Sequence, residues 1–317
     1  MEKKIKIFTS IFICMAITLF TYASLSVILA PKSIDDTGGP LYYRGIGFMA
    51  EPENSLDVVI YGNSDVYSGF IPAVLYKQYG YTSYASGRPS QEMKNILPLL
   101  QETLEEQNPK LVILESDCFF SNNTSKIDTT NIMFAPFVYH SRWKELSKKD
   151  FITLPKRTVS RDIHKGYIPS KAIFDSTEHA NYMSDEKQPA MEISKKNKEY
   201  IKDFINLCNS KSIPVLILTL PTPSSWNSAK HNCVNELADS LNISYIDMNF
   251  SYEDHNIDLS RDFRDSGDHM NIYGAEKATN YIGDYISQNY KMINNTKQSA
   301  NEKKHWNKVV AAIEKAL

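Results

Sequence analysis

The chain has little of what nucleic-acid-binding and metal-binding proteins need. Its 35 Lys and Arg residues are balanced by 37 Asp and Glu residues, and the two signs are interspersed rather than gathered into a basic patch. The four cysteines lack zinc-type spacing, and Cys14 lies in an apolar run, so we interpret them as buried free thiols rather than a disulfide framework. Neither an internal repeat nor a Gly-rich phosphate loop is present. We therefore expect no nucleic-acid partner, no cofactor and no metal.

A long apolar run lies near the N-terminus. Residues 7–30 form 24 consecutive uncharged residues, and about 20 are enough to cross a bilayer. Lys3, Lys4 and Lys6 precede the run, which favours a cytoplasmic N-terminus and places the rest of the chain outside the cell membrane. A cleaved secretion signal is the alternative, because small residues near the end of the run suit a cleavage site. In either case the sequence predicts an exported domain.

From residue 57 onward, strand-like and helix-like segments alternate. Runs of β-forming residues predict strands at 57–62, 81–86, 110–115, 213–220 and 243–248. Apolar residues at helical spacing predict helices at 71–80, 91–107, about 200–208, about 234–241 and about 275–286. Strands separated by amphipathic helices are typical of β-α-β units. We therefore expect a three-layer α/β/α fold, with a doubly wound parallel sheet of the flavodoxin-like kind.

These patterns divide the chain into four parts. They are the cytoplasmic tip and membrane anchor at 1–30, a linker at 31–56, the α/β domain at 57–290, and a helical tail at 291–317 that packs on the domain. Within the domain, an insertion at about 116–190 interrupts the alternation and mixes aromatic residues with His140 and Arg142. We interpret it as a cap over the carboxyl edge of the sheet, which either binds substrate or only packs.

Ser64 lies where the first predicted strand ends. Ligands of parallel sheets bind beyond the carboxyl ends of the strands, and the small residues Gly62 and Asn63 predict a tight turn there. Backbone N–H groups at the start of the following helix can stabilise an oxyanion. Ser64 is thus either a nucleophile or simply the cap of that helix, and the local sequence by itself favours the cap.

A histidine with acidic neighbours lies near the other end of the chain. His269 follows Asp265 and Asp268 in the loop before the last core helix, which Asn271 is placed to cap. A serine nucleophile needs a base that takes its proton, and that base needs a carboxylate on its other ring nitrogen. The pattern indicates a triad with Ser64. A metal site built from Asp265, Asp268 and His269 is a competing use of the same residues.

Two motifs together resemble the SGNH/GDSL hydrolase superfamily. They are Gly62-Asn63-Ser64 after an early strand and "DSGDHMNIYGAEK" near the C-terminus, and the resemblance covers residues 57–290 apart from the insertion. It implies that Ser64 is the nucleophile and His269 the base. Gly87, in "YASGRPS", is the candidate oxyanion glycine beside the Ser64 N–H. We also expect Asn63, His140 and Arg142 to contribute to substrate binding.

The sequence departs from the family pattern at three points. Asn63 replaces the usual acidic residue before the serine. The Asp-x-x-His spacing is not kept, so we predict Asp265 as the triad acid and Asp268 as its alternative, since an adjacent side chain turns back poorly onto His269. The third strand is followed by "ESDCFFSNN" rather than Gly-x-Asn-Asp, so the asparagine that would donate to the oxyanion is missing.

With its apolar N-terminal run, the chain resembles the membrane-anchored branch that includes the teichoic-acid D-alanylation protein and envelope-glycan O-acetyltransferase components. This resemblance implies a bacterial serine esterase or O-acyltransferase that acts on acyl groups of a cell-envelope glycan through an acyl-enzyme. It also implies a membrane-bound O-acyltransferase as partner. The alternative is a binding or assembly subunit of such a system that has kept the fold and lost the reaction, which the missing asparagine and the irregular spacing favour.

Overall fold

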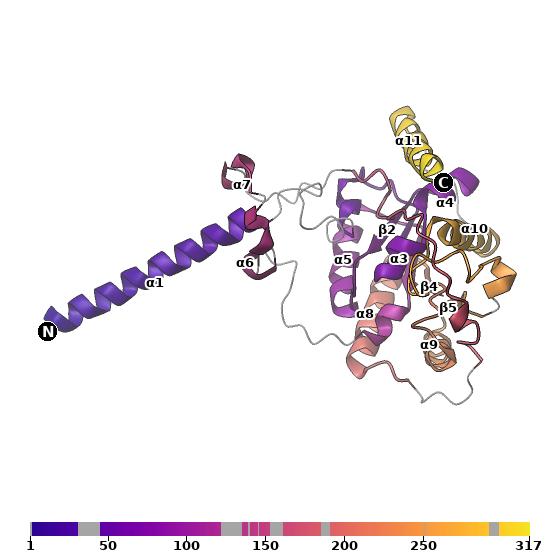
Figure 1. The fold of residues 1–317 in the computed structure, drawn as a ribbon, viewed down its shortest axis with the longest axis horizontal. Coiled ribbons are helices and arrows are strands. Elements are labelled where there is room, and N and C mark those ends of the chain that lie inside the picture. The colour runs from indigo at the N-terminus through magenta and orange to yellow at the C-terminus, as the bar shows by residue number, and fades with distance from the viewer. Residues whose placement is uncertain are drawn as a thin grey trace. The chain divides into compact units, whose positions relative to one another are not determined.

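The computed structural model describes residues 2–30, 45–121, 135–138, 140–144, 146–152, 161–184, 191–250, 252–291 and 298–317. Its contacts form two compact units. The anchor unit comprises Met1–Tyr43 and Thr124–Ser160, and the sheet unit comprises Arg44–Asn123 and Arg161–Leu317. Figure 1 shows the elements of both. Each unit is described by itself.

Five parallel strands form the centre of the sheet unit. They are β1 (Val58–Gly62), β2 (Ser83–Gly87), β3 (Leu111–Glu115), β4 (Val215–Thr219) and β5 (Ser244–Asp247). Their spatial order is β2-β1-β3-β4-β5, and each neighbouring pair is parallel. The first four strands are buried along their whole length, as strands covered on both faces must be. The order switches direction between β1 and β3, where open α/β sheets bind their ligands.

Helices cover both faces of this sheet. The longer ones are α4 (Pro72–Tyr79), α5 (Met93–Glu106), α8 (Lys195–Ser210), α9 (Ser228–Leu241) and α10 (Ile272–Asn289). Helix α4 packs against α10, whereas α5 packs against α8, and Figure 1 shows the two pairs on opposite sides of the sheet. Helix α9 contacts β5. The predicted three-layer α/β/α fold is thereby confirmed.

The predicted elements are present, and local chemistry sets their ends. Helix α4 ends before Gly80, which takes the left-handed conformation at φ 74° as a C-cap. Asn271 caps α10 as predicted, because its side chain accepts hydrogen bonds from the amides of Tyr273 and Gly274. Helix α5 contains Pro98 in its interior.

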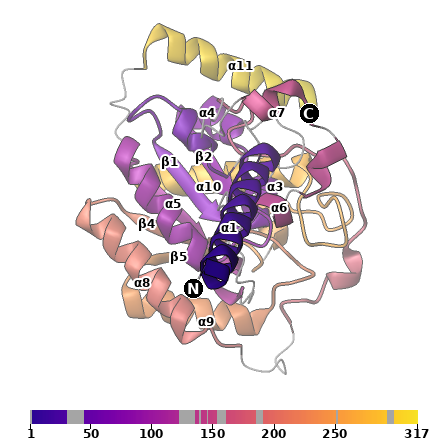
Figure 2. The same cartoon turned by 90° about the vertical axis from the view of Figure 1, so that its left-hand side faces the viewer.

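Short elements and a C-terminal helix complete the sheet unit. They are η1 (Gly47–Ala50), α3 (Ser64–Gly69), η2 (Asp117–Phe120), η5 (Thr177–His179), η6 (Tyr252–His255) and α11 (Ala300–Ala316). Helix α11 buries Trp306, Val309 and Ile313 in a cluster with residues of α4 and α10, and Figure 2 shows it lying beside α4. The tail therefore packs on the sheet unit. Phe48 of η1, inside the predicted linker, is buried as well.

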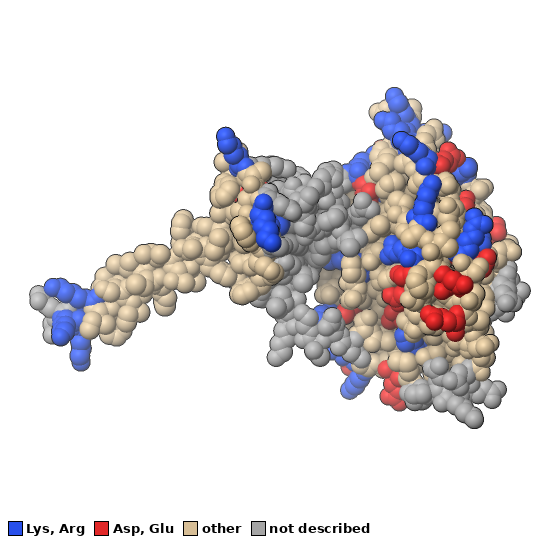
Figure 3. Space-filling view, viewed as in Figure 1, with Lys and Arg blue, Asp and Glu red and all other residues tan. Residues whose placement is uncertain are grey.

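The anchor unit contains α1 (Glu2–Leu29), α6 (Ala135–Val138), η4 (His140–Lys144) and α7 (Lys148–Ile152). Helix α1 is long and apolar enough to cross a membrane, although a signal sequence would meet the same criteria. Figure 3 shows Lys and Arg at its N-terminal tip and no charged residue along the apolar length that follows. The predicted insertion at 116–190 is divided, since α6, η4 and α7 belong to the anchor unit and residues 161–184 to the sheet unit.

All four cysteines are free. Cys118 and Cys208 are buried in the sheet unit as predicted. Cys14 corrects the prediction of buried thiols because it is exposed on α1, and Cys233 is half-buried on α9.

Candidate active site

Ser64 stands out from its surroundings by exposure. Between residues 56 and 75, every residue except Ser64 is buried. The helix that starts at Ser64 is capped by Asn63, whose side-chain oxygen accepts a hydrogen bond from the Asp65 amide at 2.9 Å. The capping role that the local sequence favours for Ser64 is thus taken by its neighbour. The Ser64 side chain is left partly exposed at the carboxyl edge of the sheet, next to the switch between β1 and β3.

Both β1 and β2 end in a glycine close to Ser64. A Cβ on Gly62, the last residue of β1, would lie 2.7 Å from a side-chain carbon of β3. A Cβ on Gly87, the last residue of β2, would lie 2.6 Å from the Asn63 carbonyl oxygen. Contacts that short do not occur between real atoms, so both positions require glycine. Gly87 therefore lies against the backbone that leads into Ser64, where its predicted oxyanion role would require it.

His269 and Asp265 form a histidine–carboxylate pair in the loop before α10. Asp265 Oδ2 lies 2.7 Å from His269 Nδ1, and Asp265 Oδ1 accepts the backbone N–H of His269 at 2.8 Å. Asp268 Oδ2 is farther from the same ring nitrogen, at 3.4 Å, and the Asp268 amide itself donates to Asp265 at 2.9 Å. The ring is consequently oriented by Asp265, the acid predicted first.

The second ring nitrogen of His269 is unused. Nε2 is buried and has no hydrogen-bond partner among the residues that the structure describes, Ser64 included. A carboxylate on Nδ1 holds the proton there and leaves the lone pair on Nε2, the arrangement of a general base. In unliganded enzymes the hydrogen bond from nucleophile to base is often long or unformed. Within the described ranges, no group of three or more His, Cys, Asp or Glu is arranged to hold a metal ion.

Tyr67, which the sequence analysis missed, connects Ser64 with His269. Its ring stacks on the His269 ring, with centroids 6.4 Å apart and an interplanar angle of 12°. The Arg264 guanidinium lies 5.8 Å above the Tyr67 ring and donates to Ser68 Oγ at 2.9 Å. Burial raises the pKa of Tyr67, while Arg264 and the Ser64 side chain oppose the rise. The phenol is therefore a neutral neighbour of Ser64, and its i+3 position was the available signal.

Three carboxyl groups lie at the ends of the two strands β1 and β3, near Ser64. Asp65 and Glu115 are buried, and Asp117 follows β3. Burial raises the pKa of Asp65 and of Glu115 well above the usual range, and the charge of Asp117 raises both further. Glu115 Oε1 accepts the Asp117 amide at 3.0 Å, whereas Oε2 has no partner in the described part of the chain. These surroundings favour the protonated form of both buried acids.

Asp117 lies after β3, where the family resemblance would place the oxyanion asparagine. Its two carboxylate oxygens accept hydrogen bonds from Asn63 Nδ2 and Lys230 Nζ, each at 2.9 Å. Lys230, also missed from the sequence, lies 5.3 Å from the ring centroid of Phe120 and 5.4 Å from that of Trp226. A carboxylate cannot donate to an oxyanion. The Asn63 amide, predicted to bind substrate, is engaged by Asp117 in this structure.

The other two predicted substrate-binding residues lie in the anchor unit. The exposed His140 has its Nδ1 2.9 Å from the Phe137 carbonyl oxygen. Arg142 is buried and donates to the Leu29 carbonyl and to Asp150. The polar contacts of both side chains lie inside that unit. Their role in substrate binding remains a prediction.

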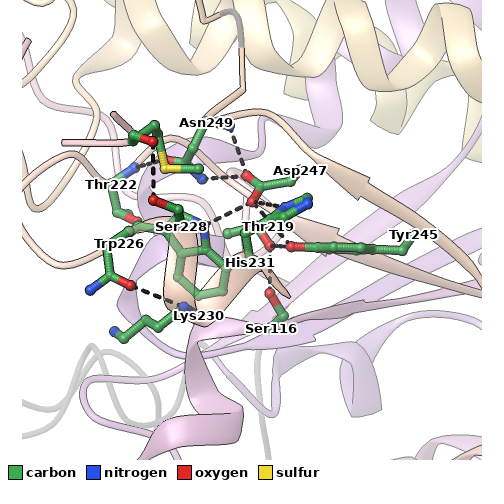
Figure 4. A network of polar contacts seen from close by, with 12 residues as sticks. Ser116, Thr219, Thr222, Trp226, Ser228, Lys230, His231, Tyr245, Asp247 and Asn249 are labelled. Carbon is green, nitrogen blue, oxygen red and sulfur yellow. Dashed lines mark hydrogen bonds and ion pairs between the residues drawn. The ribbon is translucent and has the colours of Figure 1, made fainter. Parts of the chain in front are cut away.

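A second histidine–aspartate pair, which the sequence analysis also missed, lies at the end of β5. His231 Nδ1 of α9 is 2.9 Å from Asp247 Oδ2. That oxygen also accepts Trp226 Nε1 at 2.8 Å and the Tyr245 hydroxyl at 3.2 Å. Asn249 donates its backbone and side-chain N–H groups to the other oxygen, and Figure 4 shows these contacts meeting at Asp247. This carboxylate is saturated with donors.

No family model matches the chain, and no curated protein matches it. Solved structures of GDSL-type proteins are similar to it. A GDSL-like lipase from Bacteroides thetaiotaomicron shares 12% identity over 78% of this chain and 98% of its own, with a TM-score of 0.42. A Bacteroides fragilis protein described as an acylhydrolase shares 14% identity over 80% and 98%, with a TM-score of 0.41. A Desulfitobacterium hafniense protein described as lipolytic and of the GDSL family shares 13% over 73% and 99%, with a TM-score of 0.39. At such values no catalytic residue is transferred from those proteins.

Proposed function

We propose that the chain is a membrane-anchored, extracytoplasmic serine esterase or O-acyltransferase that acts on acyl groups of a bacterial cell-envelope glycan. The observation that carries this proposal is the ring of His269, which is held through Nδ1 by Asp265 and whose buried Nε2 has no hydrogen-bond partner in the described ranges. Tyr67 stacks on this ring three residues after Ser64, which is the one partly exposed residue between positions 56 and 75. Acyl transfer needs a nitrogen that can take a proton, here His269 Nε2, and an accessible hydroxyl, here Ser64 Oγ, at the same edge of the sheet.

The reaction follows from these groups. Ser64 Oγ attacks the acyl carbonyl carbon while His269 Nε2 takes the hydroxyl proton, and Asp265 stays ionised to stabilise the imidazolium. The tetrahedral oxyanion is stabilised by the backbone N–H groups of Ser64 and Gly87. The bond to the leaving alcohol then breaks, the alcohol takes the proton from His269, and the acyl group stays on Ser64. Water or a glycan hydroxyl finally attacks the acyl carbon while His269 takes its proton, and the ester bond to Ser64 then breaks as His269 returns a proton to Ser64 Oγ.

The partners of the transfer reaction are part of the same proposal. A membrane-bound O-acyltransferase would supply the acyl group, and a hydroxyl of an envelope glycan would accept it. Support comes from α1, which has the length and apolar composition of a bilayer span and carries basic residues at its N-terminal end. A domain tethered by that helix works close to the membrane face at which a membrane-delivered acyl group emerges.

The second candidate is a binding or assembly subunit without activity, and Asp117 is the observation that favours it. This carboxylate lies where an amide donor would serve the oxyanion, and it also engages the amide of Asn63. A negative charge near a developing oxyanion opposes catalysis. Lys230, at 2.9 Å, neutralises that charge in part.

A fluorophosphonate probe, which reacts only with activated serines, separates the two candidates. We expect the full chain in native membranes to be labelled and Ser64→Ala to lose the label. Ser116→Ala is the matched control, because Ser116 is buried at the end of β3 and shares a hydrogen bond with Thr219. Labelling that persists in Ser64→Ala would remove the nucleophile role of Ser64 and assign the activated serine elsewhere, and no labelling of the wild type would favour the subunit without activity.

A further inference from the structure

The anchor unit holds a feature that the proposed chemistry does not use. We call the described residues of its α6, η4 and α7 region, 135–138, 140–144 and 146–152, the collar. The collar packs around the C-terminal end of α1: the Tyr22 and Phe137 ring centroids are 6.3 Å apart, and Arg142 Nη1 donates to the Leu29 carbonyl at 2.8 Å. Helix ends leave carbonyl groups without intrahelical partners, and an arginine there satisfies one of them.

A buried ion pair gives the collar a defined structure. Arg142 Nη2 lies 2.9 Å from Asp150 Oδ1, and Asp150 Oδ2 accepts the backbone and hydroxyl donors of Ser147 at 2.8 and 2.9 Å. Burial alone would raise the pKa of Asp150, but the hydrogen bonds from Ser147 and Arg142 outweigh it and lower that pKa. The pair therefore stays ionised at neutral pH and holds η4 and α7 against the helix end.

The outer surface of the collar is apolar and basic. Phe137, Trp143, Phe151 and Ile152 are 63%, 66%, 62% and 83% exposed. The exposed Lys144 has its ammonium 5.8 Å from the centroid of the Trp143 ring, and Lys148 is exposed as well. In the sheet unit, by contrast, both tryptophans are buried. A cluster of large exposed apolar side chains of this kind marks an interaction surface.

The level of the collar along α1 fits the outer edge of a bilayer. A hydrocarbon core of about 30 Å takes about 20 residues of helix at about 1.5 Å each. Counted from the residue after Lys6, that length ends near Ser26. Residues 3–20 of α1 are exposed throughout, and burial by the collar begins around Tyr22 and continues to Leu29. The half-buried and buried residues of α1 thus lie on both sides of the point at which the hydrocarbon core would meet the lipid headgroups, and the collar packs at this point.

We infer that the collar is a second, interfacial membrane contact, in which the four exposed apolar side chains enter the headgroup region of the outer leaflet and Lys144 and Lys148 bind lipid phosphates. This inference rests on the proposed membrane crossing of α1. A lipid occupant is favoured over a protein because the apolar surface continues from a helix with the composition of a bilayer span. The sequence 135–152 also carries four Lys and Arg against two Asp and Glu, which suits anionic lipids. Aromatic residues and lysines are the usual pair at this depth.

The three tryptophans make the inference testable with the full chain. It is reconstituted in vesicles of phosphatidylglycerol and phosphatidylcholine whose acyl chains carry bromine, a short-range quencher of indole fluorescence, at a shallow or a deep position. We expect shallow bromine to quench wild-type emission more than deep bromine does, and Trp143→Phe to lose this quenchable component. Trp226 and Trp306, which are 2% and 1% exposed, supply the remaining emission. Phe151→Trp in the Trp143→Phe background should restore the quenching.

Other outcomes would overturn the inference in distinguishable ways. Equal quenching of wild type and Trp143→Phe, or quenching of Trp143 by aqueous iodide, would place the collar in water. Shielding of Trp143 from both quenchers by a co-purifying protein would assign the surface to a protein partner. Extraction of the chain from native membranes by alkaline carbonate would instead contradict the membrane crossing of α1. A chain that resists extraction but shows no bromine quenching leaves the anchor intact and removes the collar contact.

Discussion

His269 and His231 each hold an aspartate through Nδ1, at 2.7 and 2.9 Å, and both pairs lie in the sheet unit. Their aspartates differ. The hydrogen-bond partners of the Asp265 carboxylate among the described residues belong to its own loop, and this side chain is 39% exposed, whereas Asp247 is 2% exposed and lies at the centre of the contacts in Figure 4. Asp247 links β5 to His231 of α9, whereas Asp265 orients the imidazole of His269.

The contacts that the two imidazole rings make apart from their aspartates differ as well. His269 Nε2 has no hydrogen-bond partner in the described part of the chain, and its ring stacks on Tyr67 next to Ser64. The His231 ring packs edge-on against Phe250, with centroids 4.1 Å apart. A histidine–aspartate hydrogen bond therefore says little about catalysis by itself. What distinguishes a candidate base is an unused second nitrogen beside an accessible nucleophile.

The strongest test exchanges each histidine for glutamine, which keeps the size and removes the base. We expect His269→Gln to lower kcat for a small acetyl ester by about 10³-fold or more, because proton transfer in both steps is lost. His231→Gln should stay within about threefold of wild type, since ordinary structural changes outside the site leave proton transfer intact. Steady-state hydrolysis by the two variants measures this directly. Equal losses in both would break the distinction between the pairs.

The two aspartates beside His269 should differ in their effect on kcat in the same way. Asp265→Asn is expected to lower kcat by about 10³-fold, because the amide no longer holds the productive tautomer of His269. Asp268→Asn, the control at 3.4 Å from the same nitrogen, should cost less than about tenfold, the scale of a screened charge. Activity of the two variants is compared at matched protein folding, checked by circular dichroism. A larger loss in Asp268→Asn would reassign the triad acid.

The sequence predicts the fold far better than it predicts the surroundings of the site. Alternating strand and helix patterns, the cap at Asn271 and the Gly80 stop depend on local chemistry, and all are present in the structure. The proximity of His269 to the Ser64 region follows from the rule that parallel strands bring their carboxyl ends to one edge. These inferences need only periodicity and strand order.

Contacts between distant residues could not be predicted in this way. The Lys230–Asp117 bond joins positions 113 residues apart, and nothing in either local sequence indicates it. The cap expected at 116–190 stays a prediction, but the range is divided between the two units, and the partners that Arg142 finds in Leu29 and Asp150 depend on tertiary packing. Tyr67 could have been identified from the sequence, because helical spacing places it next to Ser64.

Asp247 should matter for stability instead of turnover. Asp247→Asn leaves Trp226, Tyr245 and Asn249 with a weaker or mispaired acceptor, so we expect the free energy of unfolding to fall by about 2 kcal/mol, as for a broken buried network. Asp265→Asn, whose carboxylate is partly exposed, should change it by less than about 1 kcal/mol. Urea unfolding of both variants gives the values. A stability loss in Asp265→Asn that matches Asp247→Asn would mean that both pairs are structural.

Glu115 gives the smallest and most specific test. Burial is the main cause of the raised pKa values of Asp65, beside Ser64, and of Tyr245, in the network around Asp247, and an ionised Glu115 would raise both pKa values further. Burial keeps the folded-state pKa of Glu115 above the unfolded value of about 4.3. The folded chain therefore binds more protons than the unfolded chain between these two pKa values. The stability contribution of a protonated Glu115 is complete below the unfolded pKa, and it is lost as pH rises towards the folded pKa.

Glu115→Gln imitates the protonated acid, so it should remove this loss. We expect the melting temperature of the variant to exceed that of wild type at pH 8 by about 2–4 °C, the shift that roughly 1 kcal/mol produces in a chain of this size, and to match wild type near pH 4. Glu105→Gln, an exposed position on α5, should leave the profile unchanged. Scanning calorimetry across this pH range decides the matter. A gain that is equal at both pH values would mean that Glu115 is charged in the folded chain at pH 8.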